Sequence, residues 1–159
     1  MTDSTGGDVA PPTRDTPRSR AEFYRDVCGL DARVHTGNHR IHIVAGPVAA
    51  ITMPVELGQR IKPLLREKFG CDGPIIDHPG SRRWTFLANP DGFGLYDPVL
   101  HAELFLHRVS VAPVGSEVVL PAPSDAFLRY RMWNTLPRSP FRPWAGTVVG
   151  FALDCVNGT

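Results

Sequence analysis

Proline and glycine interrupt this chain so often that long regular elements are excluded over most of its length. Among its 159 residues are 16 prolines and 15 glycines. Proline fixes φ and lacks a backbone donor, while glycine favours turns. The chain should therefore fold into short strands and few long helices. A chain of this length is expected to form one domain and to bury roughly two-thirds of the surface of the unfolded chain.

The amino-acid composition further narrows the class of protein. The chain is 42% hydrophobic and 21% charged, as in ordinary soluble proteins, and no run of 18 apolar residues is long enough to span a bilayer. We therefore expect a cytoplasmic protein with no membrane partner, because a secretory signal pattern is also missing. The formal charge of +1 provides no overall attraction to nucleic acid. Cys28, Cys71 and Cys155 are too few for a disulfide framework and are expected to be reduced core residues.

Residues 1–18 are rich in polar residues and proline, which predicts a disordered tail before a single domain at 19–159. The pattern predicts an α+β fold, with a mixed, mostly antiparallel sheet and three to four helices. Four helices are expected: one capped by Ser19, one opened by Thr52 and Pro54 and kinked or split by Pro63, one capped by Asp97, and a final one capped by Thr147. The expected strands are a pair joined by a Gly37-Asn38 turn, a buried strand at 48–53, a strand–turn–strand at 73–87, a hairpin from 109–111 and 117–120, and a strand at 127–133.

The turn within 73–87 carries the first group of candidate site residues. Asp77 and His78 are its catalytic candidates, and Ser81, Arg82 and Arg83 follow directly. Backbone N–H groups of such a turn and guanidinium forks bind phosphate well. The alternative is that one arginine faces solvent and the other pairs with an acid.

A second basic region lies between 125 and 144 and combines arginines with aromatic rings. Basic side chains beside stacking surfaces suit single-stranded nucleic acid, although the same rings could belong to the core or to a protein interface. Its members are Arg129, Arg131, Arg138 and Arg142 with Tyr130, Trp133, Phe141 and Trp144.

The histidines His35, His39 and His42 have a spacing that could suggest zinc. The local sequence offers no fourth ligand in register, so solvent-facing histidines are expected and no metal site is predicted.

Three motifs, in order, resemble the primase/polymerase (prim-pol) domain of bifunctional replication proteins, in the archaeo-eukaryotic primase superfamily. They are VAAITMP, HPGSRRWTF and VSVAPVGSEVVLPAPS, and RYRMW resembles the end of the next strand of that family. Similar small, stand-alone versions occur in actinobacteria. The resemblance implies a prim-pol-like fold and a cleft for nucleotide or nucleic acid, with Ser81, Arg82, Arg83, Arg129 and Arg131 facing phosphate.

The same comparison implies that catalysis is lost. Thr52 and Pro54 stand where the family has metal-binding aspartates, and Ser110 stands near its third acid. Arg83 stands at or near the phosphate-contacting histidine, a role that His78 takes if the turn is offset. Without these acids a two-metal mechanism has no ligands for its ions, so no cofactor is expected.

Three hypotheses remain at this stage. The leading one is a degenerate prim-pol domain that binds nucleic acid or nucleotide, or docks on a replication or transcription protein. The second is an active nucleotidyltransferase or hydrolase, with magnesium, that uses Asp77, His78, Asp91 and Glu117. The third is a protein-interaction module in which Trp84, Trp133 and Trp144 cover one apolar face.

Overall fold

The computed structural model describes residues 15–92 and 94–158. Within these residues the chain forms five helices and two antiparallel sheets, which confirms the α+β class with more helices than expected. The helices are α1 (Pro17–Asp26), α2 (Val55–Phe69), α3 (Pro98–Leu106), α4 (Pro123–Leu128) and α5 (Ala145–Val156). The strands are β1 (Arg33–Val34), β2 (Ile41–Val44), β3 (Ala49–Pro54), β4 (Ile75–His78), β5 (Arg83–Ala88), β6 (Ser110–Val111), β7 (Glu117–Leu120) and β8 (Met132–Thr135).

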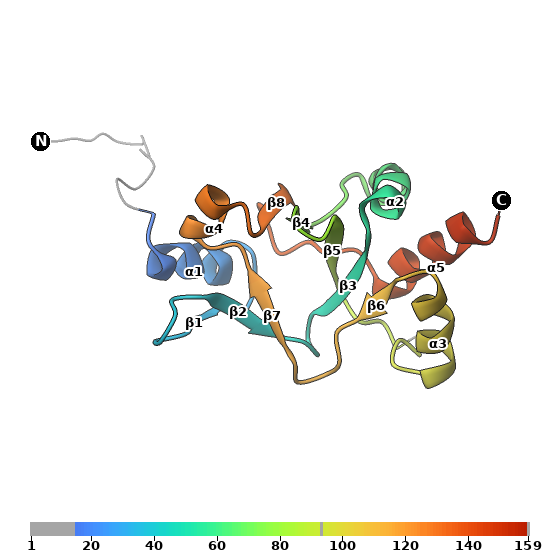
Figure 1. The fold of residues 1–159 in the computed structure, drawn as a ribbon, viewed down its shortest axis with the longest axis horizontal. Coiled ribbons are helices and arrows are strands. Elements are labelled where there is room, and N and C mark those ends of the chain that lie inside the picture. Colours follow the sequence, from blue (N-terminus) through green and yellow to red (C-terminus); the bar gives the residue numbers. More distant parts are fainter. Residues whose placement is uncertain (1–14, 93, 159) are drawn as a thin grey trace, which may run out of the picture.

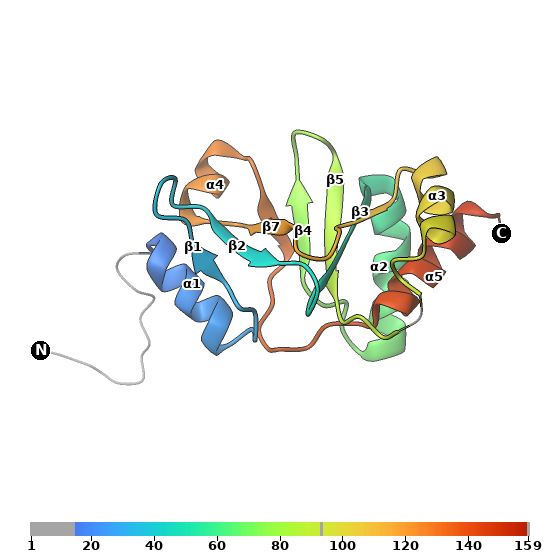
Figure 2. The same cartoon turned by 90° about the horizontal axis from the view of Figure 1, so that it is seen from below.

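The two sheets differ in size and in the helices that cover them. The large sheet has the strand order β6-β3-β5-β4-β8, and the small sheet has the order β1-β2-β7. Figures 1 and 2 show α2, α3 and α5 at one end of the molecule, with α1, α4 and the small sheet at the other. The large sheet therefore lies between two layers and is covered on both faces.

The first core fills the space between the large sheet and α2, α3 and α5. Leu57, Ile61 and Leu65 fall at helical spacing along one stripe of α2 and are buried against Ile51 and Phe86 of the sheet. Full burial of each such aliphatic side chain contributes about 1.5–3 kcal/mol. This stripe holds α2 against the sheet.

The second core lies between the opposite face of the large sheet and the small sheet with α1. Ile41 and Leu120 of the small sheet, Tyr24 of α1, and Ile76 and Leu87 of the large sheet all belong to it. Adjacent residues of β4, Ile75 and Ile76, thus enter different cores, as the alternation of a strand buried on both faces requires.

Several expected elements are confirmed. The β1–β2 turn, the buried strand β3 and the β4–β5 strand–turn–strand all form. Asp97 caps α3 by accepting a hydrogen bond from Val99 N at 3.1 Å, with Pro98 at the first helical position.

The expected hairpin of 109–111 and 117–120 is wrong. β6 pairs with β3 in the large sheet, whereas β7 pairs with β2 in the small sheet. The intervening turn therefore carries the chain from one sheet to the other. Both strands satisfy their backbone groups against partners far away in the sequence, which outweighs the local spacing.

The predicted strand at 127–133 is also only partly correct. Residues Pro123–Leu128 form α4, because proline suits the first helical position and Asp125 accepts a hydrogen bond from Ala122 N at 2.9 Å. The strand β8 begins later, at Met132.

Helix boundaries show further differences. Thr16, rather than Ser19, caps α1, and the two side chains bond reciprocally to each other's backbone N–H. The strand β3 runs through Thr52 to Pro54, so α2 begins at Val55, and Pro63 does not split this 15-residue helix. The last helix, α5, begins at Ala145 after Trp144 rather than at a Thr147 cap.

Most of the predicted tail, residues 1–14, lies outside the described residues. No helix in the described part of the chain combines the length and apolarity needed to cross a bilayer. All three cysteines are free, and Cys28 is buried as expected, but Cys71 is exposed and is therefore not a core residue.

Candidate functional site

The pairing of β3, β4, β5 and β6 brings most of the predicted site residues to one face of the large sheet. Thr52 lies opposite Thr85 and Ser110, and Arg83 lies opposite both Pro54 and His78. Directly opposed residues of antiparallel strands point to the same face. Asp77, the other catalytic candidate, alternates to the opposite face.

A groove of about 290 Å³ opens over part of this face, between the large sheet and β7, and Thr52, His78 and Arg131 help to line it. The Thr85 hydroxyl lies 2.7 Å from the Thr52 hydroxyl and 2.9 Å from His78 Nε2. Burial, and then the positive charge of Arg131, lower the pKa of His78, so the imidazole is neutral at pH 7. Glu117 is the single acid in the lining, whereas metal-dependent phosphoryl transfer needs converging carboxylates.

The arginines of the β4–β5 turn already have partners. Arg82 forms an ion pair with Glu56 at 2.8 Å, and its backbone has a φ of 56°. The Arg83 guanidinium donates to Thr52 O at 3.3 Å, and the Ser81 hydroxyl donates to His78 O at 3.5 Å. The turn is therefore held by internal contacts rather than presented as an open phosphate cradle.

The two arginines near α4 are also separated by their surroundings. Arg131 forms a nearly buried ion pair with Asp125 at 3.1 Å and lines the groove. Arg129 ends α4 in the left-handed conformation and is exposed. The part of the predicted basic region near α4 therefore divides into a paired arginine in the groove and an arginine at the surface.

The segment Leu136–Pro143 between β8 and α5, here called the connector, is the second candidate site. It contains neither helix nor strand, and residues 136–138 contain no turn. Its first half is held by Cys28, whose Sγ donates to Pro137 O at 3.5 Å, and by close packing of Gly29 against Pro140. Burial raises the pKa of the Cys28 thiol to about 11, so the thiol keeps its proton and remains a donor.

The second half of the connector is anchored more strongly. Arg142 Nε donates to Asn89 Oδ1 at 3.2 Å, and Asn89 returns hydrogen bonds to the backbone oxygens of Arg142 and Pro143. The ring of Phe141 packs 5.8 Å from that of Phe69 on α2. Both ends of the connector are thus fixed to the body of the protein.

Arg138 lies between these anchors and is exposed. Its guanidinium makes no hydrogen bond or ion pair with any residue that the structure describes, unlike those of Arg82, Arg83, Arg131 and Arg142. A pocket of about 200 Å³ lies beside it, lined in part by Leu136, Pro137 and Phe141. The connector therefore presents one free cationic side chain on a restrained backbone.

Arg138 was expected in a basic region, but no local pattern indicated the residues that hold the connector, which are Cys28, Gly29 and Asn89. They come from positions about 50 to 110 residues earlier in the chain. The closely spaced prolines at 137, 140 and 143 were the local signal of a restrained backbone.

Comparisons with known proteins point away from nucleic acid. No known family matches the chain, and no solved structure gives a significant match. A curated protein, Ecotin of Pseudomonas fluorescens, is 26% identical over 126 residues, which cover 77% of each chain. Ecotin is a serine protease inhibitor.

This finding overturns the resemblance to actinobacterial prim-pol domains, together with the nucleotide, nucleic-acid and replication or transcription partners derived from it. The physical reason is that the three motifs describe strands and turns that many antiparallel sheets contain. The structure forms those strands, but Thr52 and Ser110 supply no carboxylate, and the arginines of the turn are internally bonded.

The nucleotidyltransferase or hydrolase hypothesis fails on geometry as well. Glu117 contacts His35, Asp91 accepts a hydrogen bond from Gly146 N, and Asp77 lies on the face opposite His78. Glu117 and His78 both line the groove, but Asp77 and Asp91 do not, so the four proposed groups do not converge on one site.

The predicted tryptophan face is wrong too. Trp84 is buried in the first core, Trp133 packs against the second, and Trp144 is half exposed. The three rings therefore share no surface.

Proposed function

We propose that the protein binds and inhibits a trypsin-like serine protease through its connector, with Arg138 entering the specificity pocket. The observation that carries the proposal is the exposed side chain of Arg138, which has no hydrogen-bond or ion-pair partner among the described residues, on a backbone anchored on both sides. The 26% identity with Ecotin supports the same class of partner.

Proteases bind their substrates as extended segments, and an inhibitor gains affinity when such a segment is already restrained. The backbone of the connector is restrained, because proline fixes φ at Pro137, next to Arg138, and both flanks are tied to the body. A trypsin-like pocket contains an aspartate that pairs with an arginine or lysine side chain of the bound chain.

Other exposed arginines suit this role less well. Arg82 and Arg129 have positive φ, 56° and 60°, which an extended segment does not adopt. Arg40 closes the tight β1–β2 turn, where its backbone oxygen accepts a hydrogen bond from His35 N at 2.8 Å. Among these four arginines, Arg138 of the connector therefore suits insertion into a protease cleft best.

The test is inhibition of trypsin by the purified full chain, measured with a small chromogenic substrate. We expect Arg138→Ala to weaken inhibition about 100-fold or more, because loss of a central anchor costs about 2–4 kcal/mol. Arg138→Lys should retain most of the affinity, since the pocket aspartate also pairs with an ammonium group.

Arg129→Ala is the matched control, because this arginine is also exposed but lies outside the connector, and it should leave inhibition unchanged. Mass spectrometry of the mixture separates an inhibitor from a substrate that is simply cleaved after Arg138. Absence of inhibition at micromolar protein, or equal inhibition by the Arg138→Ala variant, would show that the connector does not act in this way.

A further inference from the structure

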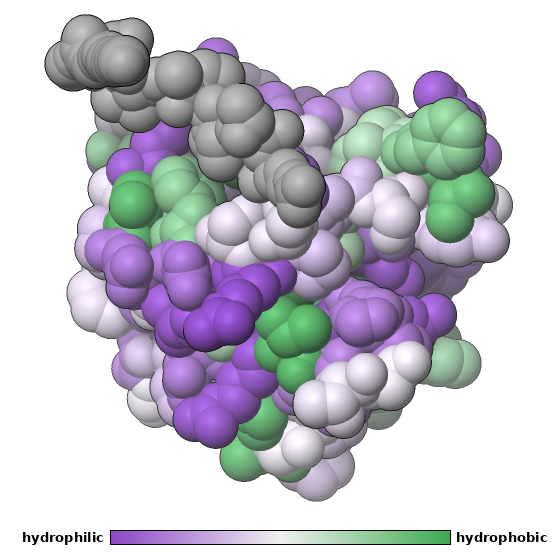
Figure 3. Space-filling model, turned by 90° about the vertical axis from the view of Figure 1, so that its left-hand side faces the viewer, coloured by the Kyte–Doolittle hydropathy of each residue, from purple (hydrophilic) through white to green (hydrophobic). Residues whose placement is uncertain are grey.

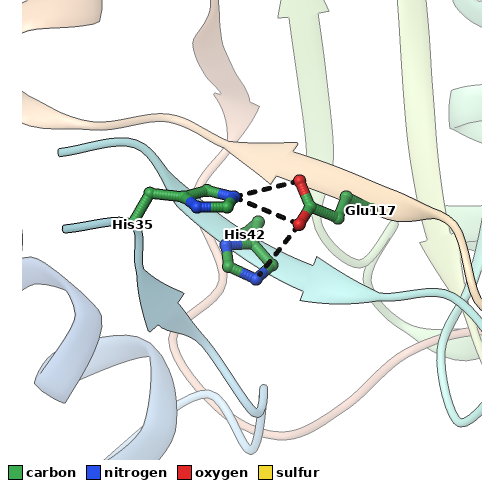
Figure 4. A group of neighbouring side chains, drawn as sticks. All are labelled: His35, His42 and Glu117. Carbon is green, nitrogen blue, oxygen red and sulfur yellow. Dashed lines mark hydrogen bonds and ion pairs between the residues drawn. The ribbon is translucent and has the colours of Figure 1, made fainter. Parts of the chain in front are cut away.

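His35, His42 and Glu117 form a compact cluster on the small sheet. His35 Nε2 lies 3.1 Å from each carboxylate oxygen of Glu117, and His42 Nε2 lies 3.7 Å from Glu117 Oε2. The two imidazole rings stack with their centroids 4.3 Å apart. Figure 4 shows both rings turned toward the carboxylate.

The strand pairing fixes these positions. His42 lies opposite Val119 and Val44 lies opposite Glu117, so His42 and Glu117 are diagonal neighbours across β2 and β7. His35 follows β1 directly, and its backbone N–H donates to Arg40 O at 2.8 Å. The strands β2 and β7 and the residue that follows β1 therefore deliver one ligand each.

The cluster lies on the face of the small sheet that turns away from the second core. Val118 and Leu120 point inward, so their alternating neighbours Glu117 and Val119 point outward. The side chains of His35 and Glu117 are 40% and 50% exposed, which leaves room for water or a further ligand. Figure 3 shows that this end of the molecule is mostly hydrophilic, with its apolar side chains in separate patches.

The spacing of the ligand atoms matches a small divalent ion. Zinc binds histidine nitrogen and carboxylate oxygen at about 2.0–2.2 Å, so ligand atoms of a tetrahedral site lie roughly 3.3–3.5 Å apart. All the ligand atoms of the cluster lie within 4.8 Å of one another, and the nitrogen–oxygen separations of 3.1 Å and 3.7 Å from Glu117 bracket the tetrahedral value. The two imidazole rings must rotate out of their stacked arrangement to aim both Nε2 lone pairs at one ion.

The donor set also selects among metals. Two imidazoles and one carboxylate suit zinc and related transition metals, whereas magnesium and calcium prefer oxygen ligands alone. His42 Nδ1 is buried without a partner among the described residues, which leaves Nε2 as the nitrogen available to a ligand.

We propose that His35, His42 and Glu117 bind one Zn²⁺ ion, with the remaining coordination position open to water or to a ligand from a partner. The histidine spacing alone did not predict a metal site. The third ligand is Glu117, which comes from β7, and His39 is not a ligand. This inference is independent of protease inhibition.

The test is calorimetric titration of zinc into the full, tag-free chain after treatment with a chelator. We expect one zinc per chain, and magnesium should give no binding. Glu117→Gln should weaken zinc affinity by about tenfold or more, because a charged ligand is lost while the side chain keeps its shape. Co²⁺ used as a probe should give visible absorption bands that the same substitution removes.

His39→Asn is the matched control. It changes the third histidine of the same turn, and asparagine tolerates the φ of 60° at this position. It should leave the zinc affinity unchanged. Absence of saturable zinc binding, equal affinity in Glu117→Gln, or an equal loss in His39→Asn would overturn the proposal. Glu117 is half exposed, so its isosteric variant should fold, and circular dichroism verifies this.

Discussion

Asp72 is a buried carboxylate that joins the end of α2 to β8. Its side chain is 4% exposed and accepts hydrogen bonds from Thr135 Oγ1 at 2.8 Å and from the Arg66 guanidinium at 3.3 Å. Lys62 Nζ lies 3.7 Å away. Burial alone would raise the pKa of Asp72, but the bonds from Thr135, the backbone and Arg66 outweigh it and lower the pKa.

We predict that Asp72→Asn lowers the free energy of unfolding at pH 7 by about 1–3 kcal/mol, because charge-assisted hydrogen bonds are lost. The folded pKa lies below the unfolded value of about 3.9, so the stabilisation is complete above that pH. It disappears as the pH falls through the folded pKa. Urea denaturation of both proteins at pH 7 and at steps down to pH 2 measures this.

The control is Asp31→Asn, which removes an exposed pair with Arg33 and should change the free energy of unfolding by about 1 kcal/mol or less. A difference between Asp72→Asn and the wild type that stays constant down to pH 2 would contradict the role assigned to the Asp72 charge.

The helix α2 shows how packing on a sheet can reverse a local preference. Gly58 lies on the buried face of α2, and a Cβ at this position would lie 2.6 Å from Trp84 Cε3 and 3.4 Å from Phe86 Cε1. We predict that Gly58→Ala destabilises the protein by about 1–3 kcal/mol through overpacking, although alanine is the better helix former.

Gly150 in α5 provides the comparison, because a Cβ there would meet nothing within 4 Å. Gly150→Ala should stabilise the protein by up to about 1 kcal/mol. Thermal melts of both variants measure the two effects, and a stabilised Gly58→Ala protein would show that the ring of Trp84 can move aside.

Elements whose signals lie within a few residues were predictable from the sequence. The cap of Asp97 and the β4–β5 turn are examples, because their hydrogen bonds close over short distances. The partners of β6 and β7 were not predictable, since Val111 pairs with Ile51 and Glu117 with Val44. For the same reason, the sequence did not indicate that Glu117 is a neighbour of His42.

At the scale of the whole molecule, Tyr24 links the two layers that flank the second core. Its hydroxyl donates to Pro121 O at 2.6 Å, just after β7, and accepts from Trp133 Nε1 of β8 at 2.9 Å. One side chain of α1 thus contacts the ends of both sheets. Its ring is completely buried.

We predict that Tyr24→Phe lowers the free energy of unfolding by about 1–3 kcal/mol, because a buried carbonyl and an indole N–H lose their partner. Tyr96→Phe is the control, since the hydroxyl of Tyr96 forms no hydrogen bond with the described residues, and it should change stability by about 0.5 kcal/mol or less. Chemical denaturation compares the two, and equal effects would exclude the proposed linking role.

The pairing of β2 with β7 also bears on how the chain is made. The partner of Ile41 is Leu120, about 80 residues later, so during synthesis the edge of β2 that pairs with β7 stays without a partner while most of the domain emerges. Unpaired strand edges are templates for association with other chains. The exposure of this edge ends only when β7 arrives, which makes the small sheet the vulnerable part of the nascent protein and the place where a holding chaperone would matter most.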